Sequence, residues 1–242
     1  MRVYALIPAR AGSKGIPNKN IRPIAGHPLL AYTIAFAKKI AFDRVIVSTD
    51  SAQYRDIAVR YGGECPYLRG PDASSDTAME EDILTDLAGN LPALGIPMPD
   101  IWVRLKPTSP FRTVKSVNNA IALLNNDDID SVRIVSETEG RLHIINADGF
   151  LQPMSPDWDP KRSVMRRSEF PATYRPFNLD VFRHAGWLAR GSNYMGHRIR
   201  PIIENKITGI DIDDESDFDL AAALISLRPR PAFLTDFIHD PS

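Results

Sequence analysis

A run of basic and small residues lies near the N-terminus, between residues 8 and 20. It reads Pro-Ala-Arg-Ala-Gly-Ser-Lys-Gly-Ile-Pro-Asn-Lys-Asn. Gly12 and Gly15 allow backbone N–H groups to turn toward an anion, as in a phosphate nest. Three cations and two neutral donors stand around them: Arg10, Ser13, Lys14, Lys19 and Asn20. The run matches neither the Walker nor the dinucleotide pattern, but its charges and glycines together favour phosphate binding over a glycine-rich turn with solvated lysines.

Two carboxylates flank one apolar residue in Asp211-Ile212-Asp213. In an extended segment, residues two apart point to the same side, so both carboxylates can face one point. Such a pair suits a hard divalent cation such as Mg²⁺. The residues alone leave an equal alternative, because acidic side chains are favoured at a helix N-terminus. Four more acidic residues follow: Asp214, Glu215, Asp217 and Asp219.

Short apolar runs alternate with helical patterns as far as residue 135. The runs predict strands at residues 3–7, 44–48, 65–68, 101–105 and 131–135. Helical patterns begin at Pro28 and after a cap at Ser51, and span residues 80–91 and 114–125. The alternation predicts an α/β fold, a three-layer sandwich with a mainly parallel, Rossmann-like sheet. Ligands of such folds bind beyond the carboxyl ends of the strands, and the basic run follows the first strand.

The pattern changes after residue 137. Residues 141–145 and 150–152 flank Asn-Ala-Asp-Gly, which predicts a β-hairpin. Residues 153–176 are polar and rich in proline, and so long a loop is usually functional or a partner arm. Regular patterns return at residues 177–182 and 197–203, and a last helix is predicted at 215–227. We treat residues 1–242 as a single domain in which 138–176 forms an excursion.

The composition limits the class of protein. Hydrophobic residues make up 43% and charged residues 24% of the chain, which is ordinary for a globular protein. The net charge of −1 gives no global reason to bind nucleic acid or an anionic membrane. No apolar run approaches the length of a membrane-spanning helix, and the single Cys65 forms no intrachain disulfide. We therefore expect a cytoplasmic protein without a nucleic-acid or membrane partner.

Further motifs follow the basic run in a fixed order. They are Val-Ile-Val-Ser-Thr-Asp at 45–50, Arg-Gly-Pro at 69–71, Ser-Asp-Thr at 75–77, Pro-Thr-Ser-Pro-Phe-Arg at 107–112 and Gly-Ile-Asp-Ile-Asp at 209–213. The whole series resembles the acylneuraminate cytidylyltransferases, the synthetases that make CMP-sialic acid. The resemblance covers nearly the whole chain and is weakest between residues 137 and 167. It implies the nucleotide-diphospho-sugar transferase type of fold, CTP and an acidic sugar as substrates, a Mg²⁺ cofactor, and a homodimer in which the 138–176 excursion reaches the partner's sugar site.

The resemblance also implies roles for residues of this chain. The nucleotide would be bound by Arg10, Ser13, Lys14, Lys19, Asn20, Arg69, Asp76 and Thr77. The metal ligands would be Asp211 and Asp213, and the catalytic residues Arg10, Lys19 and Asp213. The sugar would be bound by Lys106, Arg167 and Arg175. Guanidinium groups suit this role because they bind a carboxylate through two parallel hydrogen bonds, although a basic surface loop is the alternative for both arginines.

The chain departs from the family pattern at three places. Lys106 stands where the family usually has Gln in contact with the sugar, and residues 177–178, also near the expected sugar site, read Phe-Asn where the family has Asn-Gly. A lysine at position 106 could pair with a carboxylate or reach a different substituent. These two departures point away from ordinary N-acetylneuraminate as the sugar. Glu80, in the region that the resemblance assigns to the base and ribose, stands where the family often has Ser or Thr.

The expected reaction is attack of the anomeric hydroxyl of a 2-keto acid sugar on the α-phosphorus of CTP, with release of pyrophosphate. Alternative sugars are legionaminic, pseudaminic and deoxyoctulosonic acids. A catalytically silent nucleotide-binding scaffold is an alternative of another class, and a nucleotide hydrolase is a remoter one. The presence of Arg10, Lys19, Asp211 and Asp213 argues against the scaffold. A hydrolase needs a water-positioning base, and the sequence indicates none.

Overall fold

A six-stranded sheet forms the centre of the protein. The computed structural model describes residues 1–12 and 15–227, with the backbone alone at 177–178. The strands lie in the order β10-β6-β9-β5-β1-β4. Their bounds are β1 Val3–Pro8, β4 Arg44–Ser48, β5 Ile101–Leu105, β6 Ser131–Thr138, β9 Thr173–Arg183 and β10 Ile199–Glu204. Two short antiparallel pairs stand apart: β2 Pro23–Ile24 with β3 His27–Pro28, and β7 His143–Ile145 with β8 Leu151–Pro153.

Strand β9 runs opposite to the rest of the sheet. It is antiparallel to β5 and to β6, whereas the pairs β1–β4, β1–β5 and β6–β10 are parallel. The predicted mainly parallel sheet is therefore confirmed, with one reversed strand inside it. The carboxyl ends of β1, β4 and β5 lie at a common edge because these three strands are parallel neighbours.

Strand β1 is buried on both faces. Val3, Ala5 and Ile7 belong to one apolar cluster, and Tyr4 and Leu6 belong to another on the opposite face. A continuous apolar run is what a strand covered by helices on both sides requires. The short N-terminal run therefore forms a buried strand of a three-layer sandwich, between β5 and β4.

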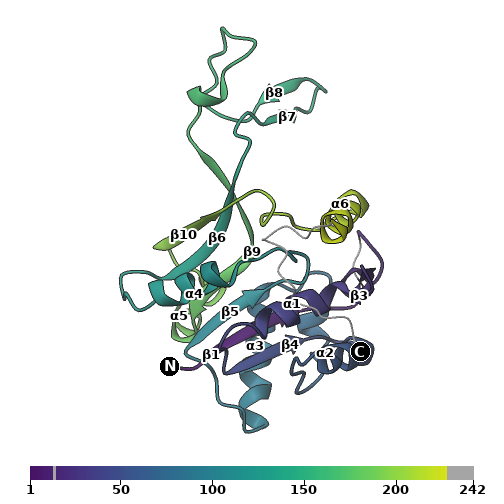
Figure 1. Ribbon diagram of the computed structural model, residues 1–242. Coiled ribbons are helices and arrows are strands. Elements are labelled where there is room, and N and C mark those ends of the chain that lie inside the picture. The colour runs from purple at the N-terminus through teal and green to yellow at the C-terminus, as the bar shows by residue number, and fades with distance from the viewer. Residues whose placement is uncertain (13–14, 228–242) are drawn as a thin grey trace.

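Six helices cover the sheet and its edge in the described residues (Figure 1). Their bounds are α1 Leu29–Ala37, α2 Ala52–Arg60, α3 Glu80–Ala93, α4 Val114–Leu123, α5 His184–Arg190 and α6 Glu215–Ser226. Helices α1, α2 and α4 pack on one face, and α3 and α5 on the other. Helix α6 packs on loop residues beside the sheet. None of these six helices combines the length and the apolar character that crossing a membrane requires.

Side chains at the loop ends start two of these helices. Ser51 accepts a hydrogen bond from the backbone N–H of Tyr54, which confirms the predicted cap of α2. Thr113 caps α4 in the same way through the N–H of Ser116. Such caps satisfy backbone donors that the first helical turn leaves unpaired.

The excursion leaves the sheet as a long ribbon. Strands β6 and β9 continue to pair beyond the core, as far as Thr138 opposite Thr173. Figure 1 shows that the β7–β8 hairpin lies at the far end of this ribbon, away from the helices. The hairpin predicted around residues 146–149 is confirmed, since the N–H of Asn146 bonds the carbonyl of Phe150. Ribbon and hairpin together form a projecting arm, residues 138–176.

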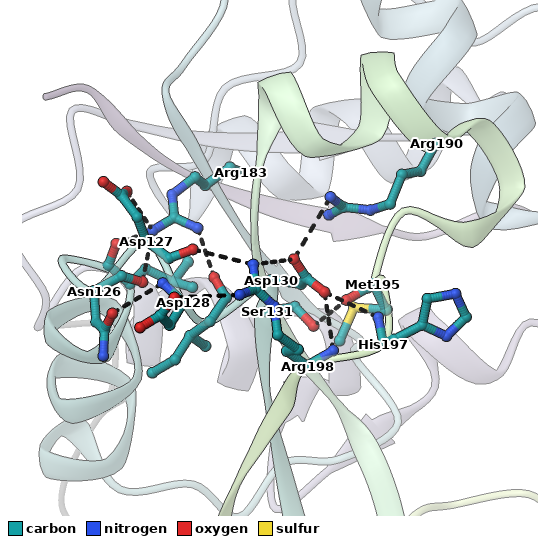
Figure 2. Close-up of polar contacts among 12 residues, drawn as sticks. Asn126, Asp127, Asp128, Asp130, Ser131, Arg183, Arg190, Met195, His197 and Arg198 are labelled. Carbon is teal, nitrogen blue, oxygen red and sulfur yellow. Dashed lines mark hydrogen bonds and ion pairs between the residues drawn. The ribbon is translucent and has the colours of Figure 1, made fainter.

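A carboxylate at the start of β6 fixes the edge strand β10. The N–H groups of His197 and Arg198 donate to Asp130 at 3.0 and 2.9 Å, and the Arg190 guanidinium lies 3.8 Å away (Figure 2). The hydroxyl of Ser131 donates to the carbonyl of Met195 at 2.6 Å. These contacts connect the loop after α5 to β6 before β10 begins to pair.

The strand predicted at residues 65–68 does not form. Glu64 makes an isolated bridge with Ile46, and the segment then leaves the sheet. Pro66 interrupts the segment, and because proline has no N–H it cannot continue a ladder. Further on, the N–H of Arg69 donates one hydrogen bond to the carbonyl of Thr49, the residue that follows β4.

Candidate active site

A polar cavity lies beyond the carboxyl ends of β1 and β5. Its volume is about 220 Å³. Five of the residues predicted to bind substrates line it: Arg10, Lys19, Asn20, Arg69 and Lys106. Other lining residues are Pro8, Glu80, Pro107 and Thr108. The fold thus brings four separate stretches of the chain to one place.

Arg10 joins the basic run to the 72–76 segment. Its guanidinium donates to the carbonyl of Ser74 at 3.3 Å and to the carboxylate of Asp76 at 2.9 Å. Thr77 lies beside them, with its hydroxyl 3.3 Å from that of Ser75. The predicted nucleotide-binding residues Arg10, Asp76 and Thr77 therefore lie together. Ser13 and Lys14 lie outside the described residues.

Lys19 joins the basic run to the acidic segment. Its ammonium donates to the carbonyl of Ile212 at 2.5 Å and lies 3.8 Å from the carboxylate of Asp213. Asn20 fixes the loop from within, since its amide donates to the carbonyl of Arg10 at 3.2 Å. Two regions that the sequence singles out separately meet through this one ammonium group.

Arg69 is buried although it lines the cavity. Burial lowers the pKa of its guanidinium, and the carboxylates of Asp50 and Asp86 oppose that shift. Its Nε is buried without a hydrogen-bond partner. A buried unpaired donor of this kind is costly.

The two aspartates of the acidic segment are close enough for their charges to interact. Ile212 between them is fully buried and its N–H bonds the carbonyl of Thr108 at 2.8 Å. Asp211 accepts from the hydroxyl of Ser109 at 3.3 Å. Desolvation by the surrounding groups, and then the Asp211 charge, raise the pKa of the Asp213 carboxyl, whose side chain keeps 78% exposure.

Two further acids of this region, Asp214 and Asp217, cap helix α6. Asp214 accepts from the N–H of Asp217, and Asp217 accepts from the N–H groups of Asp213 and Asp214. The alternative role of helix capping thus applies to Asp214 and Asp217. Asp211 and Asp213 remain as a carboxylate pair, and the described residues contain no cluster of three or more metal-ligating side chains. A pair fits Mg²⁺, which usually takes one or two carboxylates and completes its shell with water and substrate phosphates.

The three predicted sugar-binding residues do not meet within one chain. Lys106 lines the cavity and lies 3.4 Å from Glu80. Arg167 is on the arm, where it pairs with Glu137 and lines a separate cavity of about 530 Å³. Arg175, on β9, donates to the carbonyl of Gly209, two residues before Asp211. A shared sugar site would need the arm of a second copy.

Sequence reasoning missed three buried charged residues behind the cavity. Arg104 and Asp180 pair with each other inside the sheet. Burial lowers the pKa of Arg112 to about 9, while Asp211 opposes the shift. Arg112 donates to Thr33 at 3.0 Å and to the carbonyl of Lys106, and so supports the loop that follows β5. The available signal was a charged residue within an otherwise apolar strand, as in Ile-Trp-Val-Arg-Leu at 101–105.

An open, mainly parallel sheet with a basic cavity beyond its carboxyl edge is typical of α/β proteins that bind nucleotides or other anionic ligands. A solved structure of the same fold is CMP:2-keto-3-deoxy-manno-octonic acid synthetase complexed with CTP. It matches with a TM-score of 0.67 at 17% sequence identity, over 93% of this chain and 98% of that one. At this identity the match shows the fold alone.

A family model described as Cytidylyltransferase matches residues 4–200, and the chain belongs to this family. It is 31% identical over 236 residues to CMP-N,N'-diacetyllegionaminic acid synthase of Legionella pneumophila, a match that covers 94% of this chain and 98% of that protein. It is also 31% identical over 232 residues to N-acylneuraminate cytidylyltransferase of Escherichia coli, over 95% of this chain and 53% of that protein. The family resemblance of the motifs is thereby confirmed.

Proposed function

We propose that the protein is a CTP-dependent cytidylyltransferase that activates a 2-keto acid sugar of the sialic-acid type. The anomeric oxygen of the sugar bonds to the α-phosphorus of CTP, the bond from that phosphorus to the bridging oxygen breaks, and pyrophosphate leaves. The products are the CMP-sugar, pyrophosphate and the proton of the attacking hydroxyl. One observation carries the proposal: Lys19 joins the basic loop to the Asp211–Asp213 segment beside the cavity.

Charge stabilisation and positioning account for most of such a reaction. Arg10 and Lys19 would bind the phosphates with Ser13, Lys14 and Asn20, and the positive charges would meet the charge that develops on the leaving oxygens. Arg69, Asp76 and Thr77 would hold the base and ribose, supported by the place of Arg69 in the cavity lining and by the contact of Arg10 with Asp76.

Asp211 and Asp213 would hold a Mg²⁺ ion, which supplies positive charge beside the α-phosphate when bound. Lys19 is held against the carbonyl of Ile212 between them, so its own charge lies next to the same point. Asp213 would also accept the proton of the attacking hydroxyl.

We propose a homodimer as the active form. Lys106 would contact the sugar from one chain, and Arg167 would reach it from the arm of the other. Three apolar side chains of the β7–β8 hairpin support this assembly, since Ile145, Phe150 and Leu151 are 75%, 70% and 71% exposed. Exposed apolar groups gathered on one projection are typical of a surface that another chain covers.

A legionaminic-type acid is the second candidate for the sugar. The Legionella relative matches this chain over 98% of its own length, and Lys106 replaces the usual family glutamine in the cavity. Pseudaminic and deoxyoctulosonic acids are further candidate sugars for the same reaction.

The test is pyrophosphate release with each of the four nucleoside triphosphates, Mg²⁺ and a panel of 2-keto acid sugars. We expect turnover with CTP and one class of sugar, and a loss of about a hundredfold or more in Asp213→Ala. Asp219→Ala is the matched control, because Asp219 is an exposed acid on α6. Failure of the wild-type protein to bind CTP would refute the enzyme and favour a scaffold, and release without any sugar would favour a hydrolase.

A further inference from the structure

A row of alternating charges crosses the sheet behind the cavity. Asp180 on β9 lies opposite Arg104 on β5 and opposite Arg133 on β6. Both arginines bind its carboxylate, Arg133 through Nε at 2.6 Å. Asp180 is 2% exposed, and the side chain of Arg104 is 8% exposed. Buried charges of this kind are costly unless each one is paired.

The row ends at the cavity wall. The second arm of the Arg104 guanidinium donates to Glu80, the first residue of α3. The same carboxylate oxygen of Glu80 lies 3.4 Å from the Lys106 ammonium. Glu80 and Lys106 both line the cavity, and both side chains are partly exposed. The order from sheet to cavity is therefore Arg133, Asp180, Arg104, Glu80, Lys106.

Glu80 is held in its charged form. Burial alone would raise the pKa of its carboxyl, but Arg104 and Lys106 bring it below its ordinary value. Its position at the N-terminus of α3 also favours a negative charge. The wall therefore carries a fixed carboxylate directly beside an ammonium, in a cavity whose other charged residues, Arg10, Lys19 and Arg69, are all cations.

We propose that Glu80 is a specificity-determining residue of the sugar site, and that Arg104 anchors it. Glu80 keeps the Lys106 ammonium on the wall, so the pair offers one acceptor and one donor side by side. A sugar substituent with an N–H or O–H next to an acceptor oxygen matches this pair. Without Glu80, Lys106 loses its ion pair, and its ammonium attracts the phosphates or the carboxylate of the sugar. The proposal rests on the proposed function.

The test compares Glu80→Gln, Lys106→Gln and the double variant in steady-state pyrophosphate release. In Glu80→Gln we expect the KM for the sugar to rise about tenfold or more, because one charged hydrogen bond to the sugar is lost. The KM for CTP should stay within about twofold of wild type. The double variant restores a neutral donor–acceptor pair, so its KM for the sugar should lie at least about threefold below that of Glu80→Gln. A residue that only supports the fold would not give this recovery.

Glu81→Gln is the matched control, since it removes the same charge from the next residue of α3. It should leave both KM values within about twofold of wild type. A rise in the KM for CTP with no change for the sugar would assign Glu80 to the nucleotide and overturn the proposal. Equal losses in single and double variants, together with a lower Tm, would assign it to the fold. If wild-type protein turns over no sugar, the proposed function and this proposal both fail. If wild-type protein is active and Glu80→Gln has the wild-type KM for the sugar, this proposal fails alone.

Discussion

Single contacts between distant residues assemble the candidate site. Lys19 and the carbonyl of Ile212 are 193 positions apart in the chain, and one ammonium joins them at 2.5 Å. Gly15 approaches the same segment: a Cβ built on it would lie 2.6 Å from the carbonyl oxygen of Asp213. Any side chain at position 15 would therefore push the basic run away from the acidic segment.

At this scale we predict that Gly15→Ala impairs the enzyme more than the fold. The added methyl group must displace backbone, so we expect the KM for CTP to rise about tenfold or more while the Tm falls by only a few degrees. Gly89→Ala is the control, because nothing lies within 4 Å of a Cβ there, and alanine in the middle of α3 should stabilise by about 0.5–1 kcal/mol. Unchanged CTP kinetics in Gly15→Ala would contradict the close approach.

At the scale of elements, one carboxylate holds the edge of the sheet. Asp130 receives the N–H groups of His197 and Arg198 just before β10 begins, and their hydrogen bonds, Arg198 first, lower its pKa to about 2 (Figure 2). A strand at a sheet edge has a partner on one side alone, so its first contacts matter for its register.

Asp130 should make the stability of the protein depend on acid. Its pKa is depressed in the folded state from about 3.9 in the unfolded chain, so its contribution is complete above about pH 4 and is lost as the pH falls toward about 2. We expect Asp130→Asn to lower the Tm at pH 7 but to differ little from wild type near pH 2. Asp128→Asn is the control. Asp128 also pairs with Arg198, but its side chain is 88% exposed, and exposed ion pairs contribute little to stability. An equal difference at both pH values would refute the role of the charge.

At the scale of the whole molecule, the arm is the feature that a single chain does not explain. Its hairpin lies away from the helices at the end of the β6–β9 ribbon (Figure 1). Arg167 lies on the arm, outside the cavity that Lys106 lines. In a dimer, a second copy would cover the apolar side chains of the hairpin, and Arg167 would reach the sugar bound by that second copy.

We predict that Ile145→Ser with Phe150→Ser converts a dimer into monomers. Both side chains are exposed on the hairpin, and their replacement removes apolar surface that an interface would bury. Sedimentation velocity should show the change, and pyrophosphate release should fall with it. Val59→Ser is the control, because Val59 is an exposed apolar residue of α2 on the body of the protein. Monomeric wild-type protein with full activity would contradict the homodimer.

The sequence by itself determined the elements and the loops that carry chemistry. Strands β1, β4 and β5, the cap of α2 and the hairpin follow from local periodicity and turn residues, which depend on neighbours in the chain. The position of the basic run beyond a strand's carboxyl end follows from the parallel arrangement. The strand predicted at residues 65–68 was wrong, because the proline within this apolar segment cannot donate a hydrogen bond to a neighbouring strand.

Only the tertiary structure decided which distant side chains meet. It inserted β9 in reverse between β5 and β6, and thereby set Asp180 opposite two arginines and connected Arg104 through Glu80 to Lys106. It also divided the acidic residues of the 211–217 segment between the capping of α6 and a contact of Asp211 with Ser109. Such pairings depend on strand order and register, and these are fixed by the packing of the whole core, so no local pattern in the sequence reports them.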